Sequence, residues 1–293
     1  MFKITNRQIL STNIKRLTVL APQIAVKTLP GQFVVVTFEP GCERIPLSVV
    51  ETDPDRGTIT LIIEETGATT RKLGNTQIND EIYAILGPLG NPATVQKFGT
   101  TVCVASGIEA AQILSICRAL KKFGNKVVGI IGAKTRRLLV LESQMRLSCN
   151  KFFIATEDGS YERRGLATHI LKKILTEERV DAVYATGSVD MMETCAAMTR
   201  EKNVKTFVYV NPVMADGTGE CGSCRVRVGG EIRLACVDGP EFDGHQMDFA
   251  DLRIRCEAAG VQKAIVLPVK SSLGQSDNFV TRLRSWVNET IRS

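Results

Sequence analysis

Three cysteines in the last third of the sequence are spaced as ligands of an iron–sulfur cluster. Cys221 and Cys224 form a C-x2-C pair, and Cys236 follows in the same glycine-rich segment. Two thiolates at this spacing can reach one metal centre from a single turn, and glycines let backbone amides approach the sulfur atoms. In a plant-type [2Fe–2S] pattern, C-x4-C-x2-C, the first ligand position falls here on Asp216, whose carboxylate is acceptable to Fe(III). The sequence therefore predicts a [2Fe–2S] cluster with the ligands Asp216, Cys221, Cys224 and Cys236.

Zinc is the alternative metal for the same thiols. A Cys3His zinc site would take His245 or His169 as its fourth ligand, but the four-position spacing fits a ferredoxin-type cluster better. Structural thiols without a metal are a further alternative. The other cysteines lie singly in apolar stretches and are expected to be small core residues: Cys42, Cys103, Cys117, Cys149, Cys195 and Cys256.

Two segments nearer the amino terminus combine residues that can hold a phosphate group. Arg44-Ile45-Pro46-Leu47-Ser48 follows one strand-like run, and Gly67-Ala68-Thr69-Thr70 follows another. An arginine beside a serine, near a Gly-Thr-Thr loop, could hold a pyrophosphate between a guanidinium group and backbone amides. The alternative is an ordinary surface charge, which is what an arginine near a turn usually is.

The secondary structure that must position these residues changes along the chain. Residues 1–97 contain short runs of β-branched residues bounded by Gly, Pro and Asp, with no helix-length period between them, which predicts a small antiparallel β-barrel. Residues 98–210 alternate buried strands with helices, the pattern of a doubly wound parallel sheet of the nucleotide-binding type. Residues 211–248 form the cluster segment, and residues 249–293 a helical extension. Helices of the second unit are expected near residues 108–123, 136–148, 165–177 and 189–202.

Bulk properties exclude other classes of protein. The net charge is +6 but its sign alternates along the chain, and no basic stripe interleaved with aromatic residues indicates nucleic-acid binding. The first residues contain no apolar run typical of a signal peptide, and no stretch is apolar enough to span a membrane. Nine cysteines without regular spacing or an export signal favour a reducing compartment, so we expect a cytoplasmic protein.

In their order along the chain these motifs resemble the ferredoxin–NADP reductase superfamily. Within it, the chain is similar to the small subunit of NADH-dependent ferredoxin:NADP oxidoreductase, the β subunit of sulfide dehydrogenase and the electron-transfer subunit of dihydroorotate dehydrogenase. The resemblance covers roughly residues 1–250 and is carried by the motifs RIPLS, GPLGNP, GAKTRRLLVLE, DGSYERRG and DGTGECGSCRV.

The resemblance implies roles for the two amino-terminal segments. Ser48 would lie near the reactive flavin nitrogen, and the Gly67 loop would hold the FAD pyrophosphate. It also supports Asp216 as a ligand, because bifurcating reductases look as if they carry aspartate where dihydroorotate dehydrogenase relatives carry cysteine. The implied FAD-binding residues are Arg44, Pro46, Leu47, Ser48, Gly67, Thr69 and Thr70.

The expected nicotinamide nucleotide site departs from the family pattern. A turn close to G-G-G-x-G-I-A-P in relatives is here ASGIEAAQ (105–112), which puts Glu109 at a helix N-terminus that would otherwise bind phosphate. Two like charges about 4 Å apart cost roughly 4 kcal/mol at an effective dielectric constant of 20. Glu162 and the segment ATGSVDMM (185–192) also differ from relatives. These changes predict lost or weakened binding of NAD(H) or NADP(H), with sequence drift and retained binding as the alternative.

Together the motifs predict an electron-transfer subunit of an oxidoreductase, with no catalytic residues of its own. FAD would exchange electrons in pairs and the cluster one at a time. The expected partner is a larger flavin and iron–sulfur subunit resembling the glutamate synthase small chain, in an electron-bifurcating or NADP-linked complex, with a hydrogenase or ferredoxin module as a further partner. Alternatives are an NADH-oxidising small subunit and a non-catalytic structural subunit. An amphipathic stretch around Trp286 would pack on its own domain or dock onto a partner.

Overall fold

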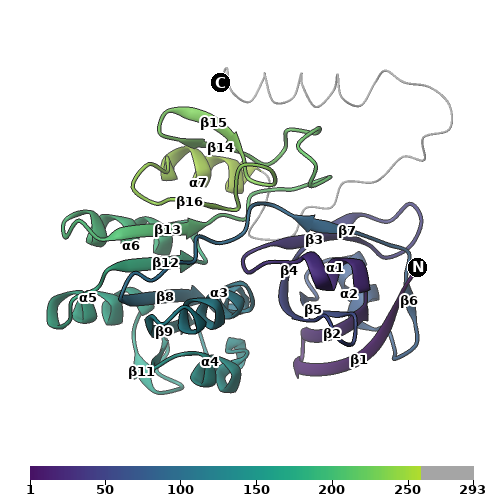
Figure 1. Cartoon of the computed structure of the whole chain (residues 1–293), viewed down its shortest axis with the longest axis horizontal. Coiled ribbons are helices and arrows are strands. Elements are labelled where there is room, and N and C mark those ends of the chain that lie inside the picture. Colours follow the sequence, from purple (N-terminus) through teal and green to yellow (C-terminus); the bar gives the residue numbers. More distant parts are fainter. Residues whose placement is uncertain (259–293) are drawn as a thin grey trace.

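Two sheets and a small hairpin make up the protein in the computed structural model, which describes residues 1–258 (Figure 1). The barrel of the amino-terminal part and the parallel sheet that follows it lie side by side, and the hairpin lies beyond the far edge of the parallel sheet. The amphipathic stretch around Trp286 lies outside the described residues. No helix within residues 1–258 is long and apolar enough to cross a membrane.

The amino-terminal sheet is antiparallel throughout and has the strand order β6-β1-β2-β5-β4-β3-β7. Its end strands β6 and β7 are separated in sequence by Tyr83 alone, so the sheet nearly closes on itself, and the predicted antiparallel barrel is confirmed. The strands are β1 (Phe2–Ser11), β2 (Ile14–Leu20), β3 (Phe33–Thr37), β4 (Arg44–Asp53), β5 (Thr58–Glu64), β6 (Glu81–Ile82) and β7 (Ala84–Leu89).

Two short helices interrupt the barrel, contrary to the expectation that this part contains strands alone. They are α1 (Pro22–Lys27) and α2 (Ala68–Gly74). Each helix is shorter than two turns, so its residues are too few to show a 3.6-residue period in the sequence. Proline at the first position of α1 favours a helix start, which is the signal that was missed.

The second sheet has the order β11-β10-β9-β8-β12-β13-β16 and is parallel except for β16. Alternate residues of β8 enter different cores: Val102 and Val104 pack with α5 and α6, whereas Cys103 and Ala105 pack with α3 and α4. Helices therefore cover both faces, as the doubly wound prediction required. The strands are β8 (Thr100–Ser106), β9 (Lys126–Ala133), β10 (Lys151–Thr156), β11 (Arg163–Arg164), β12 (Ala182–Thr186), β13 (Lys205–Tyr209) and β16 (Glu241–Asp243).

The helices of this unit are close to the predicted ranges, with one correction. The helix expected over 136–148 is divided into a 3-10 turn, η2 (Arg136–Leu138), and a shorter α4 (Glu142–Ser148). Leu141 has a left-handed backbone conformation, which interrupts the helix between them. The remaining helical elements are η1 (Gly107–Glu109), α3 (Ala110–Lys122), α5 (Ala167–Glu177), α6 (Val189–Arg200) and α7 (Phe249–Ala258).

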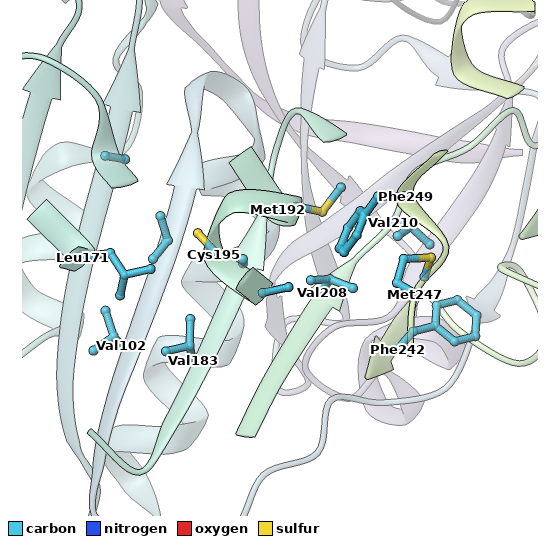
Figure 2. Close-up of a cluster of buried hydrophobic side chains, with 14 of the residues drawn as sticks. Val102, Leu171, Val183, Met192, Cys195, Val208, Val210, Phe242, Met247 and Phe249 are labelled. Atoms are coloured by element: carbon cyan, nitrogen blue, oxygen red, sulfur yellow. The ribbon is translucent and has the colours of Figure 1, made fainter. Parts of the chain in front are cut away.

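The cluster segment is anchored to the edge of the parallel sheet by buried apolar side chains. Phe242, Met247 and Phe249 lie against Val208 and Val210 of the neighbouring sheet edge (Figure 2). Strand β16 of this segment pairs with β13, which is why the apolar surfaces coincide. The hairpin β14 (Arg225–Val228) and β15 (Glu231–Leu234) projects from this base.

Two expectations about the remaining cysteines need correction. Cys42 lies in the turn between β3 and β4 rather than in an apolar strand or helix. Cys117 is not isolated, because its thiol interacts with those of Cys103 and Cys149. Hydrogen bonding with Cys103 raises the pKa of the buried Cys117 thiol well above its ordinary value, with burial adding to the effect. The Cys117 and Cys149 thiols, whose pKa values are both raised, are protonated core groups at neutral pH.

Candidate flavin and iron–sulfur sites

A tight loop orders the first two predicted cluster ligands. Asp216 accepts hydrogen bonds at Oδ1 from the Thr218 backbone N–H and at Oδ2 from the Cys221 backbone N–H, both over 2.8 Å. Partial burial acts to raise the pKa of Asp216, but these hydrogen bonds and one from Gly219 outweigh it and hold the pKa below its ordinary value. A carboxylate kept ionised beside Cys221 suits a ligand of a cationic metal.

The hairpin brings the other two predicted ligands together. Cys224 comes directly before β14 and Cys236 two residues after β15. Because the two strands are antiparallel, their outer ends meet, and the Ala235 N–H donates to the Cys224 carbonyl over 3.0 Å. The Cys224 and Cys236 sulfur atoms consequently lie 3.2 Å apart in the interior. Cys221 is exposed, with its sulfur 3.0 Å from Ser223 Oγ.

The four predicted ligands are thus arranged as two pairs. No three His, Cys, Asp or Glu side chains in residues 1–258 converge on a single metal position. A two-iron cluster requires two ligands at each iron rather than one shared point, so paired ligands are compatible with it. Burial raises the pKa of the Cys236 thiol, the Cys224 thiol raises it further, and the charges of Asp216 and Cys221 contribute, which means that the two pairs are near neighbours.

A buried donor on the residue after Cys224 fits an anionic group. Arg225 follows Cys224 directly, and its Nε is buried without a hydrogen-bond partner among the described residues. An unpaired buried N–H is costly unless an acceptor is supplied. The donor set of three thiols, one ionised carboxylate and one orphaned guanidinium N–H therefore fits an iron–sulfur cluster.

Neither candidate histidine for a zinc site belongs to this group. His245 Nε2 lies 3.0 Å from the hydroxyl of Thr199 on α6. Thr199 in turn accepts a hydrogen bond from Thr206, so His245 ties the cluster segment to the parallel sheet. His169 is exposed on α5. The structure gives His245 a bracing role, and within residues 1–258 neither His245 nor His169 is placed to complete a Cys3His zinc site.

The first predicted flavin segment lies on β4, between β5 and β3 of the barrel. Arg44 is exposed there, whereas Pro46, Leu47 and Ser48 are half-buried and pair with β3. The neighbouring Glu43 has a buried Oε2 with no hydrogen-bond partner within residues 1–258. An orphaned acceptor next to a guanidinium group fits a ligand that brings both hydroxyl groups and phosphate oxygens, as FAD does.

The second flavin segment forms the turn into α2. The Thr70 hydroxyl accepts the N–H groups of Thr66 and Gly67 over 3.0 and 2.9 Å, so this side chain braces the turn itself. Thr69 is buried nearby. An ion pair of 3.0 Å between Lys72 on α2 and Glu39, in the turn leading to β4, brings the two segments to one side of the barrel.

A cavity of about 480 Å³ lies between the barrel and the carboxyl ends of the parallel strands. This is the position at which doubly wound sheets bind nucleotides. Among its lining residues in the described chain, Lys134 is the one cation and four are acidic: Glu64, Glu109, Glu157 and Asp190. Sequence reasoning identified Glu109 alone, because the other three come from distant segments that have no shared motif.

Burial and the neighbouring charge of Glu64 raise the pKa of Glu109 to about 7. Glu64 belongs to the barrel and Glu109 to η1, so two carboxylates from separate parts of the fold border the same cavity. An added Cβ on Gly107 would lie 3.7 Å from Glu109 Oε2, which places the carboxyl group over its own turn. The acid thus occupies the turn where glycines would allow a phosphate to approach.

The cluster loop packs directly onto the barrel. A Cβ at Gly217 would lie 2.7 Å from Val35 Cγ2 on β3 and 2.9 Å from Leu89 Cδ1 on β7. Only glycine fits at this distance, and its positive φ of 77° also favours glycine. The residue next to the predicted ligand Asp216 is therefore in van der Waals contact with the barrel.

This combination of a ferredoxin-reductase-like fold with a thiol-bearing segment defines a class of electron-transfer proteins. Comparison with known proteins agrees: residues 211–248 match the iron–sulfur cluster binding domain of dihydroorotate dehydrogenase B. The chain belongs to the family of the electron transfer subunits of dihydroorotate dehydrogenase B. It is 37% identical to a homolog of that subunit from Thermotoga maritima, over 79% of this chain and 82% of the relative. The subunit from Desulforamulus reducens is 30% identical over 78% of this chain and 89% of its own.

A solved structure gives the same fold. It comes from a study of flavin-based electron bifurcation by the NADH-dependent reduced ferredoxin–NADP oxidoreductase, and one of its chains superposes with a TM-score of 0.84. Sequence identity is 33%, and the match covers 89% of this chain and 95% of that one. The chain is accordingly an electron-transfer subunit of an oxidoreductase, and the resemblance found in the sequence is confirmed.

Proposed function

We propose that this chain relays electrons between FAD on the barrel and a [2Fe–2S] cluster on the carboxyl-terminal hairpin, within a larger oxidoreductase. The observation that carries the proposal is the contact of Gly217 with Val35 and Leu89. It supports a short path between the two groups through protein without intervening solvent. When bound, FAD exchanges electrons in pairs and the cluster exchanges them singly, which converts one kind of transfer into the other.

The chain's own residues hold the two groups in place. Asp216 and Cys221 would bind one iron and Cys224 and Cys236 the other, since the pairs are already adjacent. The orphaned Arg225 Nε would donate to the cluster and offset part of its negative charge. The FAD-binding set remains the predicted one: Arg44, Pro46, Leu47, Ser48, Gly67, Thr69 and Thr70.

The nicotinamide site is weakened in this proposal. A pyrophosphate entering the cavity would approach Glu109 and Glu64 with Lys134 as the one cation in its lining. Because its pKa is about 7, Glu109 can take up a proton near neutral pH at a cost below about 1 kcal/mol, so it obstructs the pyrophosphate chiefly by occupying its turn, and charge repulsion comes mainly from Glu64. Electrons would then reach the FAD mainly from a partner. That partner is a larger flavin and iron–sulfur subunit, like the small chain of glutamate synthase, in an electron-bifurcating complex with a hydrogenase or ferredoxin module.

A second candidate is an NADH-oxidising small subunit. The name of the relative from Thermotoga maritima includes NAD(+), and that observation favours direct nucleotide oxidation. Stopped-flow mixing of the purified flavin-loaded chain with NADH or NADPH separates the two. Slow or absent flavin bleaching at micromolar nucleotide supports the relay. Rapid bleaching would show that the chain still binds and oxidises the nucleotide, so that its nicotinamide site is not weakened.

Cofactor analysis tests the relay itself. When the chain is purified anaerobically, it should contain FAD. It should also contain iron and sulfide in amounts equal to each other, and the reduced protein should give an EPR signal. Rapid transfer of electrons from photoreduced flavin to the cluster is the expected kinetic result. A chain that folds but binds neither FAD nor iron, even after reconstitution, would be a non-catalytic structural subunit instead.

A further inference from the structure

The cavity between the barrel and the parallel sheet combines apolar walls with acidic charge. Its described lining includes four acidic side chains and Lys134 as the one cation, so it favours a positively charged ligand over an anion. Glu157 and Asp190 are exposed, and Glu64 is half-buried. The apolar part of the lining consists of Ile14, Ile108, Leu138, Leu166 and Met191. A ligand that fits both parts therefore has a large apolar group beside a cation.

Helix α7 leads the chain toward this cavity. At its start, Phe249 belongs to the same buried cluster as Met192 of α6 (Figure 2). About one turn later, the Arg253 guanidinium donates to Asp190 Oδ1 over 2.8 Å. Asp190 lies in the first turn of α6 and lines the cavity. Helix α7 thus runs toward the end of α6 that borders the cavity.

The segment that follows α7 therefore begins near the cavity. Ala258, the last residue of α7, lies about 8 Å beyond Arg253 along the helix axis, at a rise of about 1.5 Å per residue. A flexible chain of roughly 25 residues has an average end-to-end distance of roughly 25–30 Å. About this many residues separate Ala258 from the stretch around Trp286, so that stretch can reach the cavity without a change in the described fold.

The sequence after α7 carries the kinds of group that fit the cavity. Trp286 belongs to an amphipathic stretch and is preceded by Arg282 and Arg284. Acidic residues in 259–293 are Asp277 and Glu289, and they are outnumbered by the basic residues Lys263, Lys270, Arg282, Arg284 and Arg292. The segment and the cavity lining are thus opposite in charge, and both contain apolar groups.

We propose that residues 259–293 bind in this cavity as an intramolecular ligand. Trp286 contacts the apolar lining, and Arg282 and Arg284 pair with acidic side chains on its two walls. These are Glu64 of the barrel and Glu157 after β10. Tethering gives the segment an effective concentration on the order of a millimolar, so contacts that would be too weak between separate molecules hold it in place. The bound segment excludes other ligands from the cavity, which makes the contact autoinhibitory.

Trp286 is the single tryptophan of the chain, so its fluorescence reports on this segment alone. In the full-length, FAD-loaded chain, acrylamide should quench this fluorescence about threefold less efficiently than it quenches N-acetyltryptophanamide, because a packed indole is shielded from solvent. The double variant Glu64→Gln/Glu157→Gln should raise the quenching constant by about twofold, since it removes the partners of both arginines. Arg282→Gln/Arg284→Gln should raise it to a similar degree.

A control variant separates this contact from a general effect of charge. Glu177→Gln/Glu201→Gln removes two exposed carboxylates at the carboxyl ends of α5 and α6, away from the cavity, and should leave the quenching constant unchanged. Arg282 and Arg284 lie outside the described residues, so their replacement tests the contact even if the cavity variant loses stability.

The proposal is overturned if acrylamide quenches Trp286 in the unaltered chain as efficiently as N-acetyltryptophanamide. It is also overturned if Trp286 is protected and both double variants leave that protection unchanged, because the segment then packs elsewhere. Protection that appears only as the protein concentration rises would place the segment on a second copy of the chain and contradict an intramolecular contact. These outcomes are separable from those for the relay, because the contact requires neither cluster assembly nor electron transfer.

Discussion

The sulfur atoms of Cys224 and Cys236 lie 3.2 Å apart, although β14, its turn and β15 separate them in the chain. The hairpin sets the position of both cysteines. Its antiparallel register runs from Arg225↔Leu234 to Val228↔Glu231, and this register fixes where the open ends of the two strands meet. Buried Val226 and Ala235 attach that end to the common core. The ligand geometry thus depends on strand pairing as well as on cysteine spacing.

Replacing one cysteine of this pair should cause loss of the iron–sulfur cluster without loss of FAD. Cys236→Ser leaves the iron proposed for this pair with one thiolate, that of Cys224, so iron and sulfide per chain should fall to less than about a quarter of the unaltered value. FAD content should stay the same, because the predicted flavin residues all belong to the barrel and Cys236 belongs to the hairpin segment. Cys42→Ser, in a turn of the barrel, is the matched control. Iron retention equal to that of the control would contradict the ligand assignment.

The carboxylate ligand gives a second, chemically graded prediction. Asp216→Asn removes the charge while keeping the shape, and should lower cluster content strongly, because a neutral amide is a poor ligand for iron. Asp216→Cys should keep the cluster and change the EPR signal of the reduced protein. An Asp216→Asn variant with full iron content and an unchanged EPR signal would show that the fourth ligand is another group.

Alanine variants at two glycines of the predicted ligand loop distinguish the effect of backbone strain from the effect of packing between the loop and the barrel. Both Gly217 and Gly222 have positive φ, so alanine at either position is strained to a similar degree. A Cβ on Gly217 would overlap Val35 and Leu89, whereas a Cβ on Gly222 meets nothing within 4 Å. Gly217→Ala should therefore destabilise the chain by about 1–3 kcal/mol more than Gly222→Ala. It should also slow electron transfer from flavin to cluster, measured after photoreduction; equal effects of the two variants would mean that the contact is unimportant.

The sequence predicted most of the architecture because both sheets have strong local signals. Alternating strands and helices identified the parallel sheet, and C-x2-C spacing identified the cluster segment. The helix expected over 136–148 was wrong because apolar residues continue through Leu138–Leu141, whereas the left-handed Leu141 that interrupts the helix is set by tertiary contacts. The short helices α1 and α2 were too brief to show a period.

The parts of the site that sequence could not supply are those made by distant segments. Glu64 joins Glu109 at the cavity only after the barrel and the parallel sheet pack together, and Asp190 joins them from the start of α6, about 80 residues further along the chain. Likewise, nothing in the sequence indicates that His245 bonds Thr199 rather than a metal. The predicted roles of the FAD residues and the four cluster ligands remain predictions, to be tested by the variants proposed above and below.

Flavin retention should depend on Arg44. Its guanidinium is exposed at the start of β4, near an orphaned Glu43 oxygen, and is proposed to bind the FAD. Arg44→Ala should raise the dissociation constant of FAD by about tenfold to a hundredfold, the effect of losing a charge-assisted pair of hydrogen bonds. Arg56→Ala, an exposed arginine on another barrel turn, is the control. Ultrafiltration with flavin fluorescence measures the loss; equal retention in both variants would count against the site.

Glu109 should make stability depend on pH. Its folded pKa of about 7 lies above the ordinary value of 4.5, so the folded state holds the proton more tightly than the unfolded state. The stability this group contributes is fully present below pH 4.5 and is lost as the pH rises through 7. Glu109→Gln should abolish that loss, raising stability relative to the unaltered chain by on the order of 1–3 kcal/mol at pH 8 but little at pH 4.5. Tm measured across this range, with Glu157→Gln as the control, checks the sign; a larger gain at low pH would contradict it.

Glu241 should hold the three parts of the fold together. It accepts hydrogen bonds from the Tyr209 hydroxyl on β13 and from the Thr94 N–H in the segment that joins the barrel to the parallel sheet. Burial raises the pKa of this carboxyl group, although the two donors act to lower it. Glu241→Ala leaves both donors without an acceptor and should cost about 1–3 kcal/mol for each that stays buried.

Glu241→Gln keeps a carbonyl acceptor at the same place and should recover most of that loss. Glu231→Ala, exposed on β15, should change the unfolding free energy by less than about 0.5 kcal/mol. Urea unfolding of the three variants gives the comparison. Because β16 carries Glu241 and anchors the cluster segment to β13, Glu241→Ala should also slow transfer from flavin to cluster, while Glu231→Ala should not. A large loss of stability with an unchanged transfer rate would show that this junction supports the fold without positioning the two cofactors.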